Sequence, residues 1–276
     1  MNNLFRALAP VSAAAWSEID KEAARSLKAT LAARRLVDFA GPQGATASAV
    51  GTGRLRPLAG LTGSGAEARL RVVLPLVELR VPFELARAEL DAVERGAKDP
   101  DLDPLIDAAR KIAMAEDRAV FHGFEAAAIR GICEAAPGKP VSLTENYEDY
   151  PLAVTAAITR LRAAGVDGPY AIALGQQCYT GLTETTKGGY PVLQHVRRLL
   201  DGPIVWAPAV KGAVVLSMRG GDFELTVGQD FSIGYLGHSA ETVSLYIQES
   251  FTFQPLSPQA AVPLVYGTAA KEKARR

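Results

Sequence analysis

The stretch Ser217–Tyr235, SMRGGDFELTVGQDFSIGY, contains two short runs in which apolar and polar residues alternate. The first run is Phe223–Val227 and the second is Phe231–Tyr235, and Gly228-Gln229-Asp230 joins them. Alternation with a period of two indicates β-strands that turn one face toward a core. No catalytic nucleophile, metal cluster or phosphate-binding loop accompanies these runs, so the stretch favours a structural or binding role.

The rest of the chain mixes helical and extended patterns. Apolar residues recur every three or four positions from Trp16 to Leu36, which predicts a helix that ends near Arg34-Arg35. Asp103-Pro104 predicts the start of a long helix that continues to about Phe121. Further helices are predicted at about 150–165, 176–185 and 191–200, and further strands at 170–174, 204–206, 213–218, 242–253 and 262–266. Strands and helices do not alternate regularly, so the pattern predicts an α+β fold and not a doubly wound cofactor-binding fold.

Residues 51–85 predict a long β-arm, because two extended segments flank a glycine-rich tip at 60–65. Pro75 and Pro82 interrupt the second segment, and proline removes a backbone donor, which indicates an edge strand. An arm of this kind buries little surface in its own subunit. We therefore expect it to lie against a neighbouring subunit.

The composition excludes several classes of protein. A chain of 276 residues with 48% hydrophobic residues is long and apolar enough to fold around a core. The 30 Lys and Arg residues balance the 30 Asp and Glu residues, so no basic excess indicates a nucleic-acid partner. No apolar run approaches the ~18 residues of a membrane span, and the apolar segment 7–16 lacks the basic start of a signal peptide. We expect a cytoplasmic protein without a membrane partner.

The reactive side chains do not form a recognisable site. Cys133 and Cys178 stand outside any metal-binding spacing, and none of the histidines has another histidine or cysteine within four positions. No catalytic residue, metal site or cofactor is therefore expected. The adjacent acids Glu116 and Asp117 are expected on a solvated helix face, because neighbouring helix residues point about 100° apart and cannot converge on one atom.

Long stretches, taken in chain order, resemble encapsulin shell proteins of the shorter-chain, linocin-like branch. Besides SMRGGDFELTVGQDFSIGY they are LVDFAGPQG from Leu36, LDAVERGAKDPDLD from Leu90, AEDRAVFHG from Ala115 and ESFTFQ from Glu249. The resemblance extends from Met1 to about Tyr266. It implies the HK97-type fold of tailed-phage major capsid proteins, with a peripheral domain, an axial domain and an extended loop.

The resemblance divides the chain into segments. These are the N-terminal helix and start of the peripheral domain at 1–48, the extended loop at 49–85, the peripheral domain with its spine helix at 86–153, the axial domain around a five-fold pore at 154–207, returning peripheral strands at 208–266 and a flexible tail at 267–276.

The resemblance implies a self-assembling shell protein of a nanocompartment and not an enzyme. Members of the family form closed icosahedral shells of sixty subunits or a multiple of that number. The shell encloses a cargo such as a dye-decolorizing peroxidase or a ferritin-like iron-storage protein. The cargo docks on the inner wall through a short C-terminal peptide. No cofactor and no specific nucleic acid are implied.

The resemblance also implies two sites. Matching motifs carry the cargo-peptide site to Leu27, Leu31, Arg34, Asp38, Asp230, Phe231 and Ile233. They carry a five-fold pore loop to Glu184, Thr185, Thr186, Lys187, Gly188, Gly189 and Tyr190, whose composition predicts a pore with weak ion preference. From the residues alone, the apolar members of the first set fit better as a helix packed on a sheet inside one subunit.

Two other interpretations are open at this point. One is a phage or prophage major capsid protein that packages DNA, and the balanced charge of the chain argues against it. The other is an enzyme, and the lack of a nucleophile or metal set argues against that.

Overall fold

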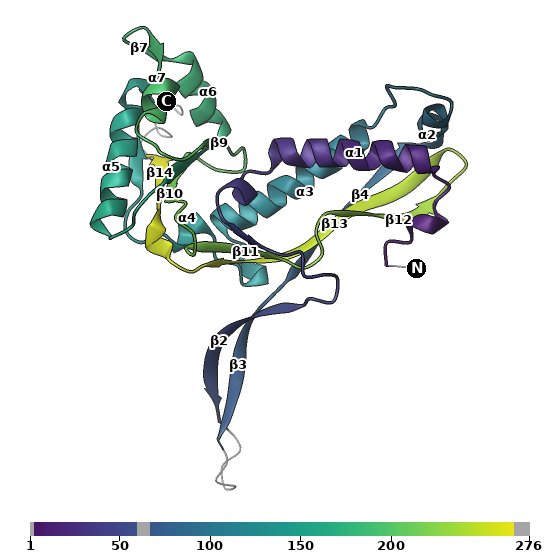
Figure 1. Cartoon of the computed structure of the whole chain (residues 1–276), viewed down its shortest axis with the longest axis horizontal. Helices are drawn as coiled ribbons and strands as arrows, with labels where there is room; N and C mark the ends of the chain where they lie inside the picture. Colours follow the sequence, from purple (N-terminus) through teal and green to yellow (C-terminus); the bar gives the residue numbers. More distant parts are fainter. Residues whose placement is uncertain (1–2, 60–66, 268–276) are drawn as a thin grey trace, which may run out of the picture.

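The computed structural model describes residues 3–59 and 67–267. Figure 1 shows a long lobe, a second lobe beside it and a hairpin that projects away from both. Helices and largely antiparallel strands are mixed along the chain, which confirms the predicted α+β class.

The long lobe is built on a sheet with the strand order β1–β11–β13–β12, in which β4 also pairs with β13. Its strands are β1 (Asp38–Ala40), β4 (Val77–Ala86), β11 (Phe223–Val227), β12 (Ser232–His238) and β13 (Thr242–Pro255). Strands β11 and β12 are the two runs of the stretch 217–235. They do not form a hairpin with each other: β12 pairs with the first half of β13 and β11 with its second half. Both predicted strands therefore lie along a single long strand.

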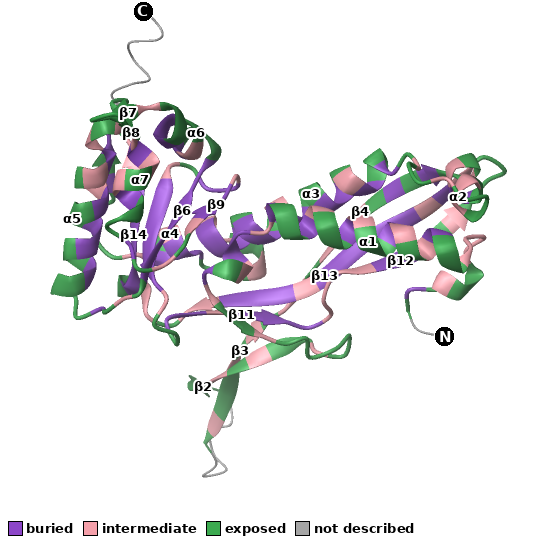
Figure 2. Ribbon diagram, turned by 45° about the horizontal axis from the view of Figure 1, so that its top comes forward, coloured by how far each residue is buried: buried purple, intermediate pink, exposed green. Residues whose placement is uncertain are grey.

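Helices α1 (Ala13–Thr30) and α3 (Asp103–His122) lie on the same side of this sheet (Figure 1), and α2 (Arg87–Glu94) lies at the far end of the lobe. The residues of α1 that recur at helical spacing, Ile19 and Leu27 among them, are buried against α3 and the sheet. Figure 2 shows the buried stripes that α1, α3 and β13 turn toward one another. The observed α3 confirms the long helix predicted from Asp103-Pro104.

Helix α1 ends earlier than the sequence predicts. Its last residue is Thr30, and the short 3₁₀ helix η2 (Ala33–Arg35) follows after a break. The backbone N–H groups of Ala32 and Ala33 donate to the carboxylate of Asp117 on α3, over 2.8–3.2 Å. A side chain from another helix thus supplies the acceptors that one more turn of α1 would have supplied.

The second lobe is built on a sheet with the strand order β5–β14–β10–β6–β9. Its elements are β5 (Val141–Leu143), β6 (Tyr170–Leu174), β9 (Ile204–Trp206), β10 (Ala213–Ser217) and β14 (Ala261–Tyr266), with α4 (Ile132–Ala135), α5 (Tyr150–Ala163), α6 (Gln176–Glu184) and α7 (Val192–Arg197). Every residue of β6 and β10 is buried, which is typical of strands covered on both faces. Because β5, β10 and β14 belong to this sheet, the lobe draws on residues outside the range 154–207 that we expected for the axial domain.

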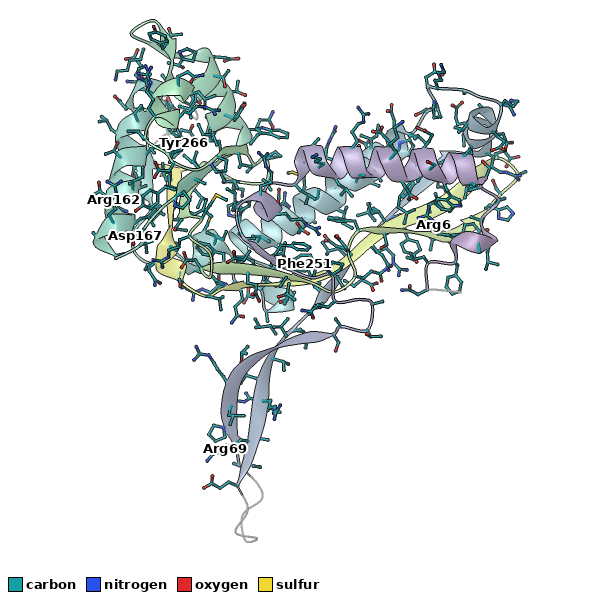
Figure 3. The ribbon with its side chains drawn as sticks, viewed as in Figure 1. Arg6, Arg69, Arg162, Asp167, Phe251 and Tyr266 are labelled. Atoms are coloured by element: carbon teal, nitrogen blue, oxygen red, sulfur yellow. The ribbon has the colours of Figure 1, made fainter. Side chains whose placement is uncertain are left out.

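The projecting hairpin consists of β2 (Ala49–Leu58) and β3 (Ala68–Pro75), and Figure 3 shows Arg69 near its outer end. No residue of either strand is buried, and the two strands pair only with each other among the described strands. The predicted tip at 60–65 lies outside the described residues. The expected loop range 49–85 also includes most of β4, which pairs with β13 in the long lobe, so the projecting part ends at Pro75. Pro82 lies in β4, which has β13 as its single described neighbour, as the prediction of an edge strand requires.

Candidate functional site

An open groove of about 650 Å³ lies beside the C-terminal end of α1. Its lining residues are Ala24, Leu27, Lys28, Leu31, Arg34 and Arg35. Leu27 is 7% exposed and belongs to the hydrophobic cluster below, whereas Leu31 is partly exposed at the surface of the groove. The structure therefore brings Leu27, Leu31 and Arg34 to one apolar surface bordered by basic side chains.

Arg34 connects this groove to the sheet. Its Nε donates to both carboxylate oxygens of Glu116 at 3.0 and 2.9 Å, and its Nη1 donates to Asp230 Oδ1 at 2.7 Å. Its Nη2 donates to Glu116 Oε2 at 2.6 Å and to Glu249 Oε2 at 3.0 Å. The planar guanidinium fixes orientation as well as distance in such charge-assisted bonds. One side chain thus joins η2, α3, β13 and the connection between β11 and β12.

Two phenylalanine rings flank the same guanidinium. The Cζ atom of Arg34 lies 4.4 Å from the ring centroid of Phe231 and 5.2 Å from that of Phe39. Both distances are within the range of cation–π attraction. Phe39 is 41% exposed and was not predicted from the sequence, although its place next to Asp38 was a signal that could have found it.

Glu116 and Asp117 do not lie on a solvated face, so that prediction is wrong. Both side chains are fully buried. Glu116 holds Arg34, and Asp117 accepts the backbone bonds that end α1. Burial raises the pKa of Asp117 to about 7, although the N–H donors of Ala33 and Ala32 act in the opposite direction. The helical spacing predicts that both acids lie on this helix, but it does not predict which groups each carboxylate contacts.

The remaining residues implied for the cargo-peptide site occupy different places. Ile233 is 4% exposed and packs in the cluster between the sheet and the two long helices. Asp38 accepts a hydrogen bond from the Gly221 N–H at 2.6 Å and so faces the turn before β11. Leu27 and Ile233 therefore pack between helix and sheet inside the subunit, as the residues alone predicted. Asp230 and Phe231 contact Arg34, which borders the groove.

The residues implied for a pore lie at the end of α6 and in the exposed hairpin β7 (Thr186–Lys187) and β8 (Tyr190–Pro191). Gly188 and Gly189 form its turn with φ of 60° and 82°, in the left-handed region that favours glycine. The Nζ of Lys187 donates to the carbonyl oxygen of Glu148 at 3.1 Å, which ties the hairpin to the short 3₁₀ helix at Tyr147–Asp149, just before α5.

Over residues 3–59 and 67–267, no group of three or more His, Cys, Asp and Glu side chains is arranged to hold a metal ion. Within the same ranges, none of the helices combines the length and the apolar character needed to cross a membrane. Cys133 and Cys178 are free thiols.

A protein-family model described as "Encapsulating protein for peroxidase" matches residues 1–252. The type 1 encapsulin shell protein of Rhodospirillum rubrum is 58% identical to the chain over 270 residues, which cover 96% of each protein. The chain belongs to the encapsulin shell protein family. The type 1 encapsulin shell protein of Mycobacterium tuberculosis is 49% identical and covers 96% of this chain and 99% of its own length.

Solved structures show the same fold at low sequence identity. A virus-like particle from Pyrococcus furiosus has a TM-score of 0.62 at 16% identity and covers 90% of this chain and 98% of its own. The capsid of the Myoviridae phage XM1 has a TM-score of 0.54 at 10% identity, with coverage of 83% and 90%. The HK97-type capsid fold implied by the resemblance is confirmed.

Membership in the encapsulin family confirms a shell protein of a nanocompartment rather than an enzyme. It also distinguishes an encapsulin shell protein from a phage capsid protein. The chain is 49–58% identical to these two encapsulins but 10% identical to the phage capsid, which favours the encapsulin over a phage capsid protein that packages DNA.

Proposed function

We propose that copies of the chain assemble into a closed shell around a cargo enzyme, and that the cargo docks in the α1 groove through its C-terminal peptide. A peroxidase is the first cargo class to test, because the matching family is described as encapsulating a peroxidase. A ferritin-like protein is the second. A cytoplasmic location stays part of this proposal.

The exposed apolar surface of the projecting hairpin is the observation that best supports assembly of the subunits. Its large apolar side chains are about half exposed: Leu55 54%, Leu58 46%, Leu70 45% and Val73 49%. A two-stranded hairpin alone is only marginally stable in water. Full burial of an exposed side chain of this kind contributes about 1.5–3 kcal/mol, so covering the exposed half of each contributes roughly half of that. A neighbouring subunit that covers them stabilises both the hairpin and the contact.

The α1 groove supports docking of an extended, mainly apolar peptide. Leu31 lines it and Phe231 lies against Arg34 at its border; both are partly exposed and can cover aliphatic side chains. Arg34 already bonds three carboxylates, so its charge is compensated within the subunit. We therefore assign most of the affinity to apolar contact, with Arg34 orienting the surface and Ile233 supporting it from below.

The same proposal assigns the hairpin β7–β8 and the end of α6 to the five-fold pore. Lys187 donates to a backbone carbonyl of its own subunit, and two glycines form the turn. Few fixed charges then face the opening, which supports a weak ion preference.

The test is co-expression with a dye-decolorizing peroxidase that carries or lacks its C-terminal extension, followed by electron microscopy and an activity assay of sedimenting particles. We expect closed shells in both cases and peroxidase activity inside them only with the extension. Monomers or small oligomers of the chain alone would contradict assembly. Equal loading without the extension would contradict peptide docking.

A groove variant sharpens this test. Leu31→Asp is expected to reduce peroxidase loading while shells still form, because it introduces a charge into the apolar surface. Lys21→Asp is the matched control, since Lys21 lies on the exposed side of α1 with 74% of its side chain accessible. Wild-type loading of Leu31→Asp shells would show that the groove is not the docking surface, and loss of loading in both variants would trace the effect to negative charge on α1 in general.

A further inference from the structure

A group of charged side chains lies where the two hydrophobic clusters of the subunit meet. On β13, Glu249 lies between Ile247 of one cluster and Phe251 of the other, and Glu116 occupies the corresponding place on α3. Both side chains are fully buried. Together with Asp230 they present three carboxyl groups to the single guanidinium of Arg34. A buried charge without a compensating partner is costly, so full ionisation of this group is unfavourable.

One oxygen of the group has no donor. The Nη2 of Arg34 lies 2.6 Å from Glu116 Oε2 and 3.0 Å from Glu249 Oε2, so one nitrogen holds both carboxyl groups beside each other. Glu249 Oε1 is inaccessible to solvent and has no hydrogen-bond partner among the described residues. As part of an ionised carboxylate it would lose its hydration without replacement. With a proton attached the Glu249 carboxyl group becomes a donor, and the Glu116 carboxylate, which the same Nη2 holds beside it, is the acceptor.

We propose that Glu249 is protonated at neutral pH, that it donates this proton to the Glu116 carboxylate in a hydrogen bond, and that the pair positions Arg34 beside the groove. Burial and the neighbouring charge of Glu116 both raise the pKa of Glu249 well above its usual value, in agreement with this assignment. Arg34 acts in the opposite direction, and Asp230 raises the pKa further. The adjacent strand β4 presents the apolar Leu79 in register with Glu249.

Loss of this proton changes the balance of charge at the junction. With Glu249 neutral, Arg34 faces two negative charges; with Glu249 ionised, it faces three. Repulsion between Glu116 and Glu249 then separates α3 from β13 and draws Arg34 away from the position that borders the groove. Both acids act through Arg34 and are positioning residues, and their effect on docking rests on the proposed function.

The sign of the pH effect follows from the direction of the pKa change. The folded chain binds more protons than the unfolded chain between the unfolded and folded pKa values of Glu249, so its stability falls as pH rises through that window. One linked proton changes the ratio of folded to unfolded chain about tenfold per pH unit.

Infrared difference spectra of assembled shells test the proton directly. The spectra are compared in the Asp117→Asn background, because the pKa of Asp117 is raised to about 7 and its carboxyl group would give a band of its own at neutral pH. In that background we expect the carbonyl stretch of a protonated carboxyl group, and we expect it to disappear when Glu249→Gln is added, whose amide keeps a donor for Glu116. Asp230→Asn is the matched control, because it removes a carboxylate from the exposed side of Arg34 and should retain the band. Glu116→Gln should lose the band as well, because it removes the charge that holds the proton on Glu249. A band that neither glutamine substitution changes in this background overturns the proposal.

Stability and loading supply the functional readout. The pH dependence of thermal unfolding should flatten in Glu249→Gln and persist in Asp230→Asn; an unchanged slope in Glu249→Gln overturns the proposal. Wild-type shells should load less peroxidase at alkaline than at neutral pH, and Glu249→Gln should load equally at both. If wild-type shells load no peroxidase at any pH, the proposed docking in the groove is refuted. The infrared band does not depend on docking, so it tests separately whether Glu249 and Glu116 share a proton.

Discussion

Replacing Asp117 by alanine removes the acceptor that holds the turn between α1 and η2. Its two oxygens accept hydrogen bonds from the N–H groups of Ala32 and Ala33, and all three residues are fully buried. A buried N–H group left without an acceptor costs about 1–3 kcal/mol, so the two groups together cost about 2–6 kcal/mol of unfolding free energy. Asp117→Asn keeps one oxygen as an acceptor and is expected to cost less.

The stability difference between wild type and Asp117→Asn should also depend on pH. Burial raises the pKa of Asp117 from its usual 3.8 to about 7, so the folded chain binds more protons than the unfolded chain between these values. The wild-type free energy of unfolding therefore falls as pH rises across this window. The asparagine side chain does not titrate, so the variant should be most destabilised relative to wild type near the acid end.

Urea unfolding followed by tryptophan fluorescence in a Trp206→Phe background, which leaves Trp16 on α1 as the reporter, measures both effects together with hydrogen exchange at Ala32 and Ala33. Asp107→Ala is the matched control on the same helix, because Asp107 is 63% exposed and lies 3.8 Å from Arg110. We expect the control to change stability by less than about 0.5 kcal/mol. If Asp117→Ala behaves like the control and both amides stay protected, Asp117 does not hold this turn.

Three further predictions concern the hairpin, the pore loop and the packing of α6. Leu58→Ser combined with Leu70→Ser should prevent shell assembly without unfolding the subunit, as measured by native mass spectrometry and circular dichroism; a wild-type yield of shells would refute the role of the hairpin. Lys187→Ala should leave a weak ion preference, and conductance with sharp charge selection that survives the substitution would contradict the proposed pore. Gly181→Ala should cost about 1–3 kcal/mol, because a Cβ there would lie 2.1 Å from the ring of Tyr147. Gly51→Ala, with no atom within 4 Å, is its control, and equal melting temperatures would show that Tyr147 moves aside.

Elements with strong local signals could be predicted from the sequence. The strand predicted at 170–174 matches β6, and the helix predicted from Asp103 matches α3 within a residue or so at its end. A continuous apolar run and a proline in the first turn act within a few residues. Both signals are therefore visible in the sequence without knowledge of the fold.

Features that depend on distant partners could not be predicted in this way. Asp117 ends α1 from 85 positions along the chain, and Glu249 meets Arg34 from 215 positions away. The burial of Glu116 also depends on Arg34. An acid on a helix is predicted to be exposed to solvent unless a buried partner for its charge is known. Strand β4 was assigned to the arm because its pairing with β13 joins segments far apart in the sequence.

The residues of the candidate site also divide into those that the sequence predicted and those that depend on distant partners. Arg34, Asp230 and Phe231 were expected from family resemblance, and the structure joins them through a hydrogen bond and a cation–π contact of the guanidinium. Phe39, Glu116 and Glu249 complete the surroundings of Arg34 and were not expected. The packing of α3 on β13 brings Glu116 and Glu249 together, and no spacing in the sequence indicates it. Phe39 comes from β1, next to the expected Asp38.

The course of β13 and α3 through both hydrophobic clusters has a mechanical consequence. The first half of β13 packs with α1, and Phe251 and Phe253 in its second half pack with the second lobe. Helix α3 is shared in the same way, so we expect the two lobes to move together. We therefore expect a difference in curvature between small and large shells to arise at the contacts between subunits, which we propose the projecting hairpins form, and not by bending within a subunit.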